Sequence, residues 1–259
     1  MPLSTSDAVA RAPQAGARAR SHAHAELRQA ILNGDYAPGQ RLVEEDLAAL
    51  LGVTRASVRA ALLDLTAEGL VERIPNRGAR VRVVTTEEAV AITECRMALE
   101  ALCAAKAAQH VTDAEVAELR RLGDGMTSAV AAEDGCRYSQ LNHEMHRRVR
   151  EISGQHVAIG LLERLNAQLV RYQFQIALRP GRPERSLGEH LAIIDAVAER
   201  RPADAEAAIR RHLESVIAAL RSEDQRMPDA AGPPGAAGLS GATGALAAEH
   251  AAHASPGHD

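Results

Sequence analysis

Three histidines and one asparagine are the residues of this sequence best suited to bind a metal ion. Asn142 and His146 are four residues apart, so their side chains lie on one face of a helix. His190 and His212 each lie among aliphatic residues at helical spacing, which places them on or beside the inward faces of two further helices. Three imidazoles with one oxygen suit Zn²⁺, Ni²⁺ or Mn²⁺. The alternative is that each histidine is a hydrogen-bonded residue of the helical core.

Arg96 is the residue best placed to bind an anion. It shares a helical face with apolar residues, so it points toward the interior, where an arginine needs an anionic partner. That partner is either an acidic side chain, such as Glu100 four residues on, or the carboxylate of a small organic acid beside the metal. Arg171 and Tyr172 are further candidates to line the same effector cavity.

A second set of chemical groups, in the first third of the chain, is suited to bind DNA. Leu47, Leu50 and Leu51 predict a short helix with one apolar side, and Gly52 breaks it as the turn of a helix-turn-helix does. Thr54 can cap the next helix. Two exposed arginines one turn apart, Arg55 and Arg59, open that helix. Arginine side chains in this position suit the edge of guanine in the major groove.

The residues that follow predict a β-hairpin wing. Residues 70–74 and 79–84 alternate as two short strands around Pro75-Asn76-Arg77-Gly78. A glycine at the tip lets the backbone approach DNA closely, and Arg77 beside it supplies positive charge. Helix, turn, helix and basic wing together predict a winged helix-turn-helix.

The segment LRQAILNGDYAPGQRLVEEDLAALLGVTRASVRAALLDLTAEGLVERIPNRGARV resembles the N-terminal domain of the GntR family of bacterial transcription regulators. The resemblance implies DNA contacts by the arginine after PG-x, the two arginines of the recognition helix and the glycine of the wing. The family often has Ser-Arg-Thr-Pro where this chain has Thr54-Arg55-Ala56-Ser57, so the hydroxyl of Thr54 is kept and a polar group is lost at Ala56. The expected DNA-contacting residues are Arg41, Thr54, Arg55, Ser57, Arg59, Arg77 and Gly78.

The second half resembles the FCD ligand-binding domain of the FadR branch of that family. The matching marks are Arg96-x-x-Leu99-Glu100, Asn142-x-x-Met145-His146, Glu189-His190-x-x-Ile193 and His212-Leu213. The resemblance implies a divalent metal bound by Asn142, His146, His190 and His212. The family often has Asp where this chain has Asn142, and losing that charge weakens the site for hard cations. We therefore expect Zn²⁺ or Ni²⁺, at partial occupancy.

Residues 86–221 are helical by pattern throughout. The expected helices are 86–109, 112–133, 136–153, 156–179, 186–200 and 203–223. The predicted fold class is mainly α, with a winged helix-turn-helix followed by an antiparallel helical bundle. The predicted domains are a DNA-binding domain at 21–84 and an effector-binding and dimerisation domain at 85–223. Residues 1–20 and 224–259 are rich in Ala, Pro, Ser and Gly without apolar periodicity, so both are predicted to be disordered tails.

Composition limits the remaining possibilities. A net charge of -4 and a pI near 6.3 argue against a nonspecific coat for nucleic acid. Three cysteines without metal-ligand spacing are expected to be reduced thiols. Without an apolar run long enough to cross a membrane, and without a signal peptide, the expected location is the cytoplasm with no membrane partner.

These observations predict a homodimeric, metabolite-responsive transcription repressor rather than an enzyme. It would bind a pseudo-palindromic operator and release it when a small organic acid binds in the helical domain. Two alternatives remain. One is a metal-dependent enzyme fused to a DNA-binding module, since three histidines with an open position also describe catalytic sites. The other is an architectural DNA-binding protein whose bundle serves only to dimerise.

Overall fold

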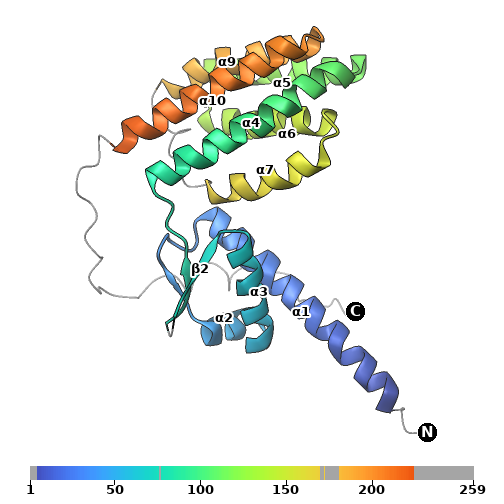
Figure 1. The fold of residues 1–259 in the computed structure, drawn as a ribbon, viewed down its shortest axis with the longest axis vertical. Coiled ribbons are helices and arrows are strands. Elements are labelled where there is room, and N and C mark those ends of the chain that lie inside the picture. The colour runs from blue at the N-terminus through green and yellow to red at the C-terminus, as the bar shows by residue number, and fades with distance from the viewer. Residues whose placement is uncertain (1–4, 76, 170–171, 173–180, 225–259) are drawn as a thin grey trace, which may run out of the picture. The chain divides into compact units, whose positions relative to one another are not determined.

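The computed structural model is mainly helical, with one small antiparallel sheet (Figure 1). It describes residues 5–75, 77–169, 172 and 181–224. The elements are a helix-turn-helix with a wing, followed by a set of packed helices, which confirms the predicted fold class. Within the described part of the chain, none of the helices is long and apolar enough to span a membrane.

The N-terminal elements form a winged helix-turn-helix. They are α1 (Thr5–Asn33), β1 (Arg41–Leu42), α2 (Glu44–Leu51), α3 (Arg55–Ala67), β2 (Val71–Ile74) and β3 (Gly78–Val81). Gly52 ends α2 with a φ of 64°, a left-handed conformation that costs glycine little. Thr54 caps α3 as predicted, because its Oγ1 accepts a 3.1 Å hydrogen bond from the backbone N–H of Ser57.

The apolar stripe of α3 is buried. Its members are Val58, Ala61, Leu62 and Leu65. The prediction that Leu50 belongs to the apolar side of α2 is wrong, because its side chain is 55% exposed. The packed face of this short helix carries Leu47 and Ala48 instead.

The wing is a three-stranded sheet in the order β1-β3-β2. All neighbouring strands are antiparallel, with Ile74 opposite Gly78 and Arg41 opposite Arg80. The sequence predicted the β2–β3 hairpin but not the third strand, β1. Gly78 has a φ of 87°, and the backbone N–H of Arg77 donates a 3.0 Å hydrogen bond to the carbonyl of Ile74. These two features make the turn at the wing tip tight.

The predicted disorder of residues 1–20 is wrong for residues 5–20, which belong to α1. Alanine, abundant in this stretch, is the strongest helix former, and it gives no apolar periodicity by which the helix could be recognised. Arg20 of this segment is also fixed to α3, since its guanidinium donates hydrogen bonds of 2.7 and 2.5 Å to Asp64. Residues 1–4 and 225–259, the rest of the predicted tails, lie outside the described residues.

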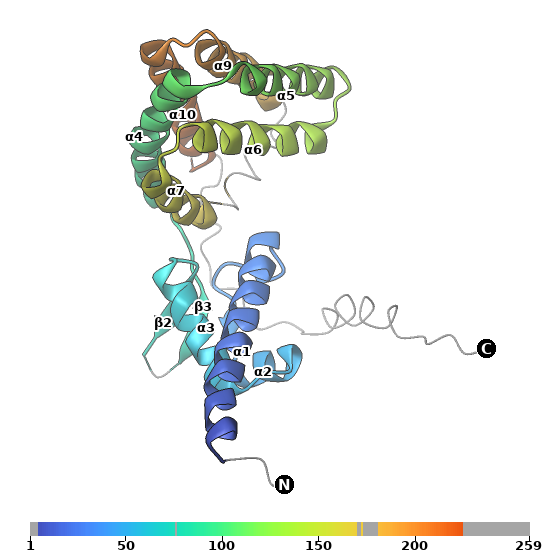
Figure 2. The same cartoon turned by 90° about the vertical axis from the view of Figure 1, so that its right-hand side faces the viewer.

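The second half is a set of packed helices. They are α4 (Thr86–His110), α5 (Asp113–Ala131), α6 (Gly135–Ile152), α7 (His156–Gln168), α9 (Arg182–Ala198) and α10 (Pro202–Asp224). Helix α10 lies along α4 in Figure 1, and α5 lies along α6 in Figure 2. Thr112 and Glu115 form a capping box at the start of α5. The helix predicted at 156–179 ends at Gln168, and most of residues 170–180 lie outside the described part.

One apolar core joins α4, α5, α6, α9 and α10. Fully buried side chains from these helices include Ala104, Met126, Met145, Ile193 and Leu213. The small alanines of α4 let neighbouring helices approach closely. This core fixes α6, α9 and α10 against one another, and those three helices carry the predicted metal ligands.

Candidate metal and effector site and candidate DNA interface

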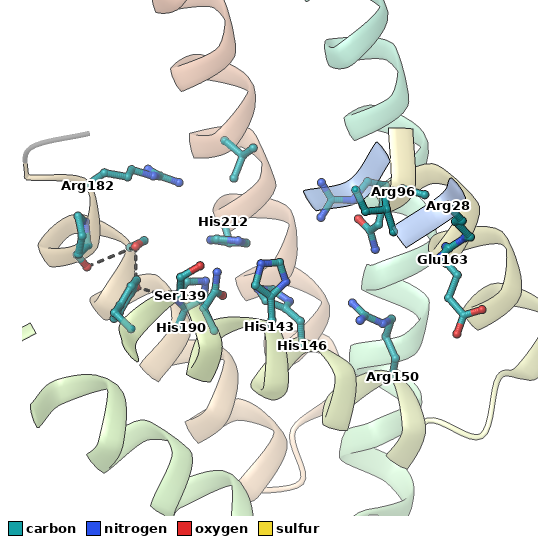
Figure 3. A pocket seen from close by; sticks show the side chains of 18 residues that line it. Arg28, Arg96, Ser139, His143, His146, Arg150, Glu163, Arg182, His190 and His212 are labelled. Carbon is teal, nitrogen blue, oxygen red and sulfur yellow. Dashed lines mark hydrogen bonds between the residues drawn. The ribbon is translucent and has the colours of Figure 1, made fainter. Parts of the chain in front are cut away.

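The structure brings the three predicted histidine ligands together inside the bundle. His146 comes from α6, His190 from α9 and His212 from α10, and one ring nitrogen of each lies within 4.8 Å of the others (Figure 3). The ring centroids are 5.2 Å apart for His146 with either neighbour, and 4.5 Å apart for His190 and His212. Because they come from three helices, these rings are held by the core rather than by local sequence.

Two of the imidazoles are oriented by carboxylates. Nδ1 of His212 lies 2.8 Å from Oε2 of Glu189, and Nδ1 of His146 lies 3.4 Å from Oε2 of Glu100. An ionised carboxylate only accepts, so each Nδ1 carries the proton and each Nε2 keeps a free lone pair. Carboxylate–histidine pairs of this kind orient metal-binding imidazoles.

A hydroxyl chain orients the third imidazole. Ser186 Oγ donates to the carbonyl of Pro183, so the hydroxyl of Tyr138 must donate to Ser186, at 2.6 Å. The oxygen of Tyr138 is then the acceptor for Nδ1–H of His190, at 3.0 Å. Nε2 of His190 therefore also keeps a free lone pair. Burial also raises the pKa of Tyr138 to about 12, which keeps its hydroxyl protonated.

The electrostatics of the cluster favour neutral, ligating imidazoles. Burial lowers the pKa of His146 to about 4, despite the opposing effect of Glu100. Burial also lowers the pKa of His190 well below its ordinary value, and the neighbouring imidazoles lower it further. Burial alone would raise the pKa of Glu100, but Arg96 and His146 hold it well below its usual range. The Glu100 carboxylate therefore stays ionised, and His146 and His190 stay neutral near pH 7.

Two buried polar atoms at this site fit a metal ion. Oδ1 of Asn142 and Nε2 of His190 have no hydrogen-bond partner among the residues that the structure describes. Unpartnered buried acceptors are costly, and a bound cation would satisfy both. Three imidazole nitrogens and one amide oxygen form a donor set for Zn²⁺ or Ni²⁺ and bring no negative charge.

Replacing the carboxylate that orients His212 should weaken metal binding. We expect Glu189→Gln to lower Zn²⁺ affinity by about 10–100-fold, because the imidazole loses a charged acceptor and becomes less basic. Competition with a chromophoric chelator measures this. Glu184→Gln on the exposed side of α9 is the matched control and should keep the parent affinity. Equal Zn²⁺ affinity for both variants would contradict the assigned role of Glu189.

A cavity of about 430 Å³ opens beside the cluster. All four predicted metal ligands line it, as does Arg96 (Figure 3). Arg96 and Glu100 are 8% and 2% exposed, and the guanidinium donates hydrogen bonds of 2.9 and 3.2 Å to Oε1 of Glu100. The structure therefore contains the ion pair that the sequence allowed as an alternative to carboxylate binding. A role for Arg96 in effector binding stays a prediction.

Of the other two predicted effector residues, the structure describes only Tyr172. The hydroxyl of Tyr172 donates a 2.9 Å hydrogen bond to the carbonyl of Val84, and its ring packs on an apolar cluster that includes Leu169. Tyr172 is not among the lining residues. Its prediction assumed that α7 continues in register, whereas α7 ends at Gln168. Arg171 lies outside the described residues.

Several residues of the site were missed by sequence reasoning. Tyr138, Arg150, Arg182 and Ser186 line the cavity, and Arg182 donates a 2.7 Å hydrogen bond to Ser215. Only Arg150 had a sequence signal, because it lies one helical turn after His146. The others depend on contacts between helices that are distant in sequence.

The predicted DNA-contacting arginines are exposed. Arg59 donates hydrogen bonds of 2.7 and 3.1 Å to Glu44, and Arg55 lies 3.8 Å from Glu45. Such exposed pairs contribute little stability, so the arginines can exchange these carboxylates for DNA at small cost. Arg41 on β1 is also exposed.

The rest of the predicted DNA interface divides into two groups. Arg77 and Gly78 are exposed at the wing tip. Ser57 is buried, and its Oγ lies 2.9 Å from Oγ1 of Thr54, so this pair positions the start of α3. A side-chain DNA contact by Ser57 stays a prediction.

Comparison with known protein families agrees with this architecture. Residues 19–81 match the model described as bacterial regulatory proteins, gntR family, and residues 91–215 match the model described as FCD domain. The chain belongs to the GntR family. FCD domains are often associated with a metal, in agreement with the histidine cluster.

The relatives of this GntR-family chain include repressors. The HTH-type transcriptional repressor NanR of Salmonella typhimurium is 28% identical, with 87% of this chain and 94% of NanR covered. A GntR transcriptional regulator from Rhodococcus sp. RHA1 is 28% identical over 78% of this chain and 97% of its own, with a TM-score of 0.62. E. coli McbR/YncC shares the fold, with a TM-score of 0.65 at 20% identity over 80% of this chain and 98% of its own. The names of the first two describe transcription regulators, so the alternative of a metal-dependent enzyme is not favoured.

Proposed function

We propose that this GntR-family regulator is a homodimeric repressor that releases its operator when a small organic acid binds beside a divalent metal ion. The observation that carries the proposal is the cavity of about 430 Å³ on which three imidazoles and several arginines converge. The imidazoles offer nitrogens to a metal, and the arginines offer positive charge to an acid. Zn²⁺ and Ni²⁺ suit this donor set better than Mg²⁺, because Asn142 supplies no charge.

The DNA-binding half supports a pseudo-palindromic operator. A single winged helix reads few base pairs, and a two-fold dimer would place two α3 helices in successive major grooves. Arg55, Arg59 and Arg77 would supply the base and phosphate contacts at each half-site. Because the target is the bacterial chromosome, the proposed place of action is the cytoplasm.

The test is fluorescence anisotropy of labelled DNA from the region upstream of the gene, titrated with a panel of organic acids. We expect one class of acid to lower operator affinity when the chain is loaded with Zn²⁺. Operator DNA must then lower acid affinity by the same factor, typically about 5–150-fold. If no acid changes operator affinity, the architectural alternative is the better account.

Removing Arg96 should abolish this response and leave operator binding intact, because Arg96 lies on α4, outside the helix-turn-helix and the wing. Arg96→Ala leaves Glu100 as a buried, unpaired charge, which costs about 3–5 kcal/mol of folding stability. The double variant Arg96→Met/Glu100→Gln avoids that charge and keeps the test valid if the single variant unfolds. If one acid releases the parent and both variants from the operator at the same concentration, Arg96 is a structural residue only.

A further inference from the structure

Among the described residues, four arginines line the cavity, and carboxylates already neutralise three of them. The pairs are Arg28 with Glu68 at 3.0 Å, Arg96 with Glu100 at 2.9 Å, and Arg182 with Glu189 at 3.7 Å. In each pair the guanidinium contributes little net charge to a bound ligand. An acid would have to displace a carboxylate to bind any of these three fully.

The fourth arginine, Arg150, is different. Its guanidinium makes no hydrogen bond or ion pair with any residue in the described part of the chain, although the side chain is half-buried and lines the cavity. Among the described residues, Glu163 is the one acidic residue that lines the cavity, and it is exposed and forms no ion pair with Arg150. The sequence of residues 170–180, VRYQFQIALRP, contains no acid that could supply a partner.

Arg150 is also positioned beside the metal ligands. It lies on α6 one turn after His146, on the same side of the helix, and Figure 3 shows it among the side chains that surround the cavity. A ligand that touches His146 can therefore reach Arg150 as well.

The charges of the site indicate what kind of ligand it takes. The donor set of three neutral imidazoles and Asn142 leaves the charge of a divalent cation uncompensated. The unpaired guanidinium of Arg150 adds another positive charge at the same cavity. Buried positive charge is stable only with negative charge beside it. The single negative charge of a monocarboxylate would compensate only part of the charge of the cation and Arg150.

We infer that Arg150 binds one carboxylate of the effector, and that this effector carries a second anionic group facing the histidine cluster. The inference rests on the function proposed above and names the class of acid, a dicarboxylate. Arg96 is then a positioning residue, because it holds Glu100 and Glu100 orients Nδ1 of His146.

The experiment compares succinate, glutarate and adipate with their monomethyl esters by isothermal titration calorimetry on the full chain loaded with Zn²⁺. At least one dicarboxylate should bind about tenfold or more tightly than its ester, because a charge-assisted bond to Arg150 is lost in the ester. Arg150→Gln should remove this preference while Zn²⁺ affinity stays at the parent value. Arg147→Gln is the matched control, since Arg147 is exposed on the same helix and does not line the cavity.

Each outcome decides the inference. An unchanged preference in Arg150→Gln, or equal binding of diacid and ester by the parent, overturns it. If acids bind the parent and Arg150→Gln equally, and release both from the operator, only this inference fails and the proposed function stands. If none of the acids binds the Zn²⁺-loaded chain, both fail. Should Arg150→Gln have a lowered melting temperature, Arg150→Lys keeps the charge and should retain part of the preference.

Discussion

The double variant Arg55→Ala/Arg59→Ala should lose specific operator binding. Each arginine is expected to contribute about 1–3 kcal/mol through a forked contact with guanine. If the two add, the loss is about 2–6 kcal/mol for one half-site, which is roughly 30-fold or more in affinity. Both side chains are exposed and held only by surface carboxylates, so their removal should leave the fold intact.

The measurement is a gel-shift titration with the upstream DNA and a scrambled duplex of equal length. The variant should bind both duplexes with similar, weak affinity, because phosphate contacts are retained and base contacts are lost. Arg120→Ala/Arg121→Ala on exposed positions of α5 removes the same charge from the helical domain and should bind like the parent. Undiminished discrimination by the Arg55/Arg59 variant would disprove α3 as the reading helix.

Replacing His190 with alanine should abolish metal binding. His190 is 1% exposed, and its Nδ1 is hydrogen-bonded to Tyr138. Its Nε2 has no partner among the described residues, so the lone pair of Nε2 is available to bind a metal ion. Removing one imidazole leaves two nitrogens and a neutral amide. We expect the loss to exceed the roughly 10–100-fold effect of an orienting residue. The parent, purified without a His-tag, should carry up to one Zn²⁺ or Ni²⁺ per chain.

Elemental analysis after dialysis measures metal content, and thermal unfolding with added Zn²⁺ or Ni²⁺ measures binding independently. His143→Ala is the matched control. His143 also lines the cavity, but it is exposed and lies outside the histidine cluster, so its removal should leave metal content unchanged. No metal in the dialysed parent, together with no thermal shift, would mean that the cluster is polar core or binds the effector directly.

The local elements were predictable because their signals are local. The cap at Thr54, the left-handed Gly52 and the capping box at Thr112 each depend on residues within four positions. The inward stripe of α3 follows from helical periodicity alone. Where periodicity is missing, as in the alanine-rich start of α1, the helix was missed.

The sequence by itself determined which residue types face the interior of α6, α9 and α10, and so predicted that His146, His190 and His212 could share a site. Only the tertiary structure decided how they are used. The proton on each Nδ1 depends on Glu100, Glu189 and the Tyr138 chain, which reach the rings from other turns and other helices. Likewise, only the tertiary structure shows that Arg96 pairs with Glu100, whereas Arg150 has no partner among the described residues. Periodicity specifies a face, but a side chain's partner depends on which faces pack together, and that is a property of the whole fold.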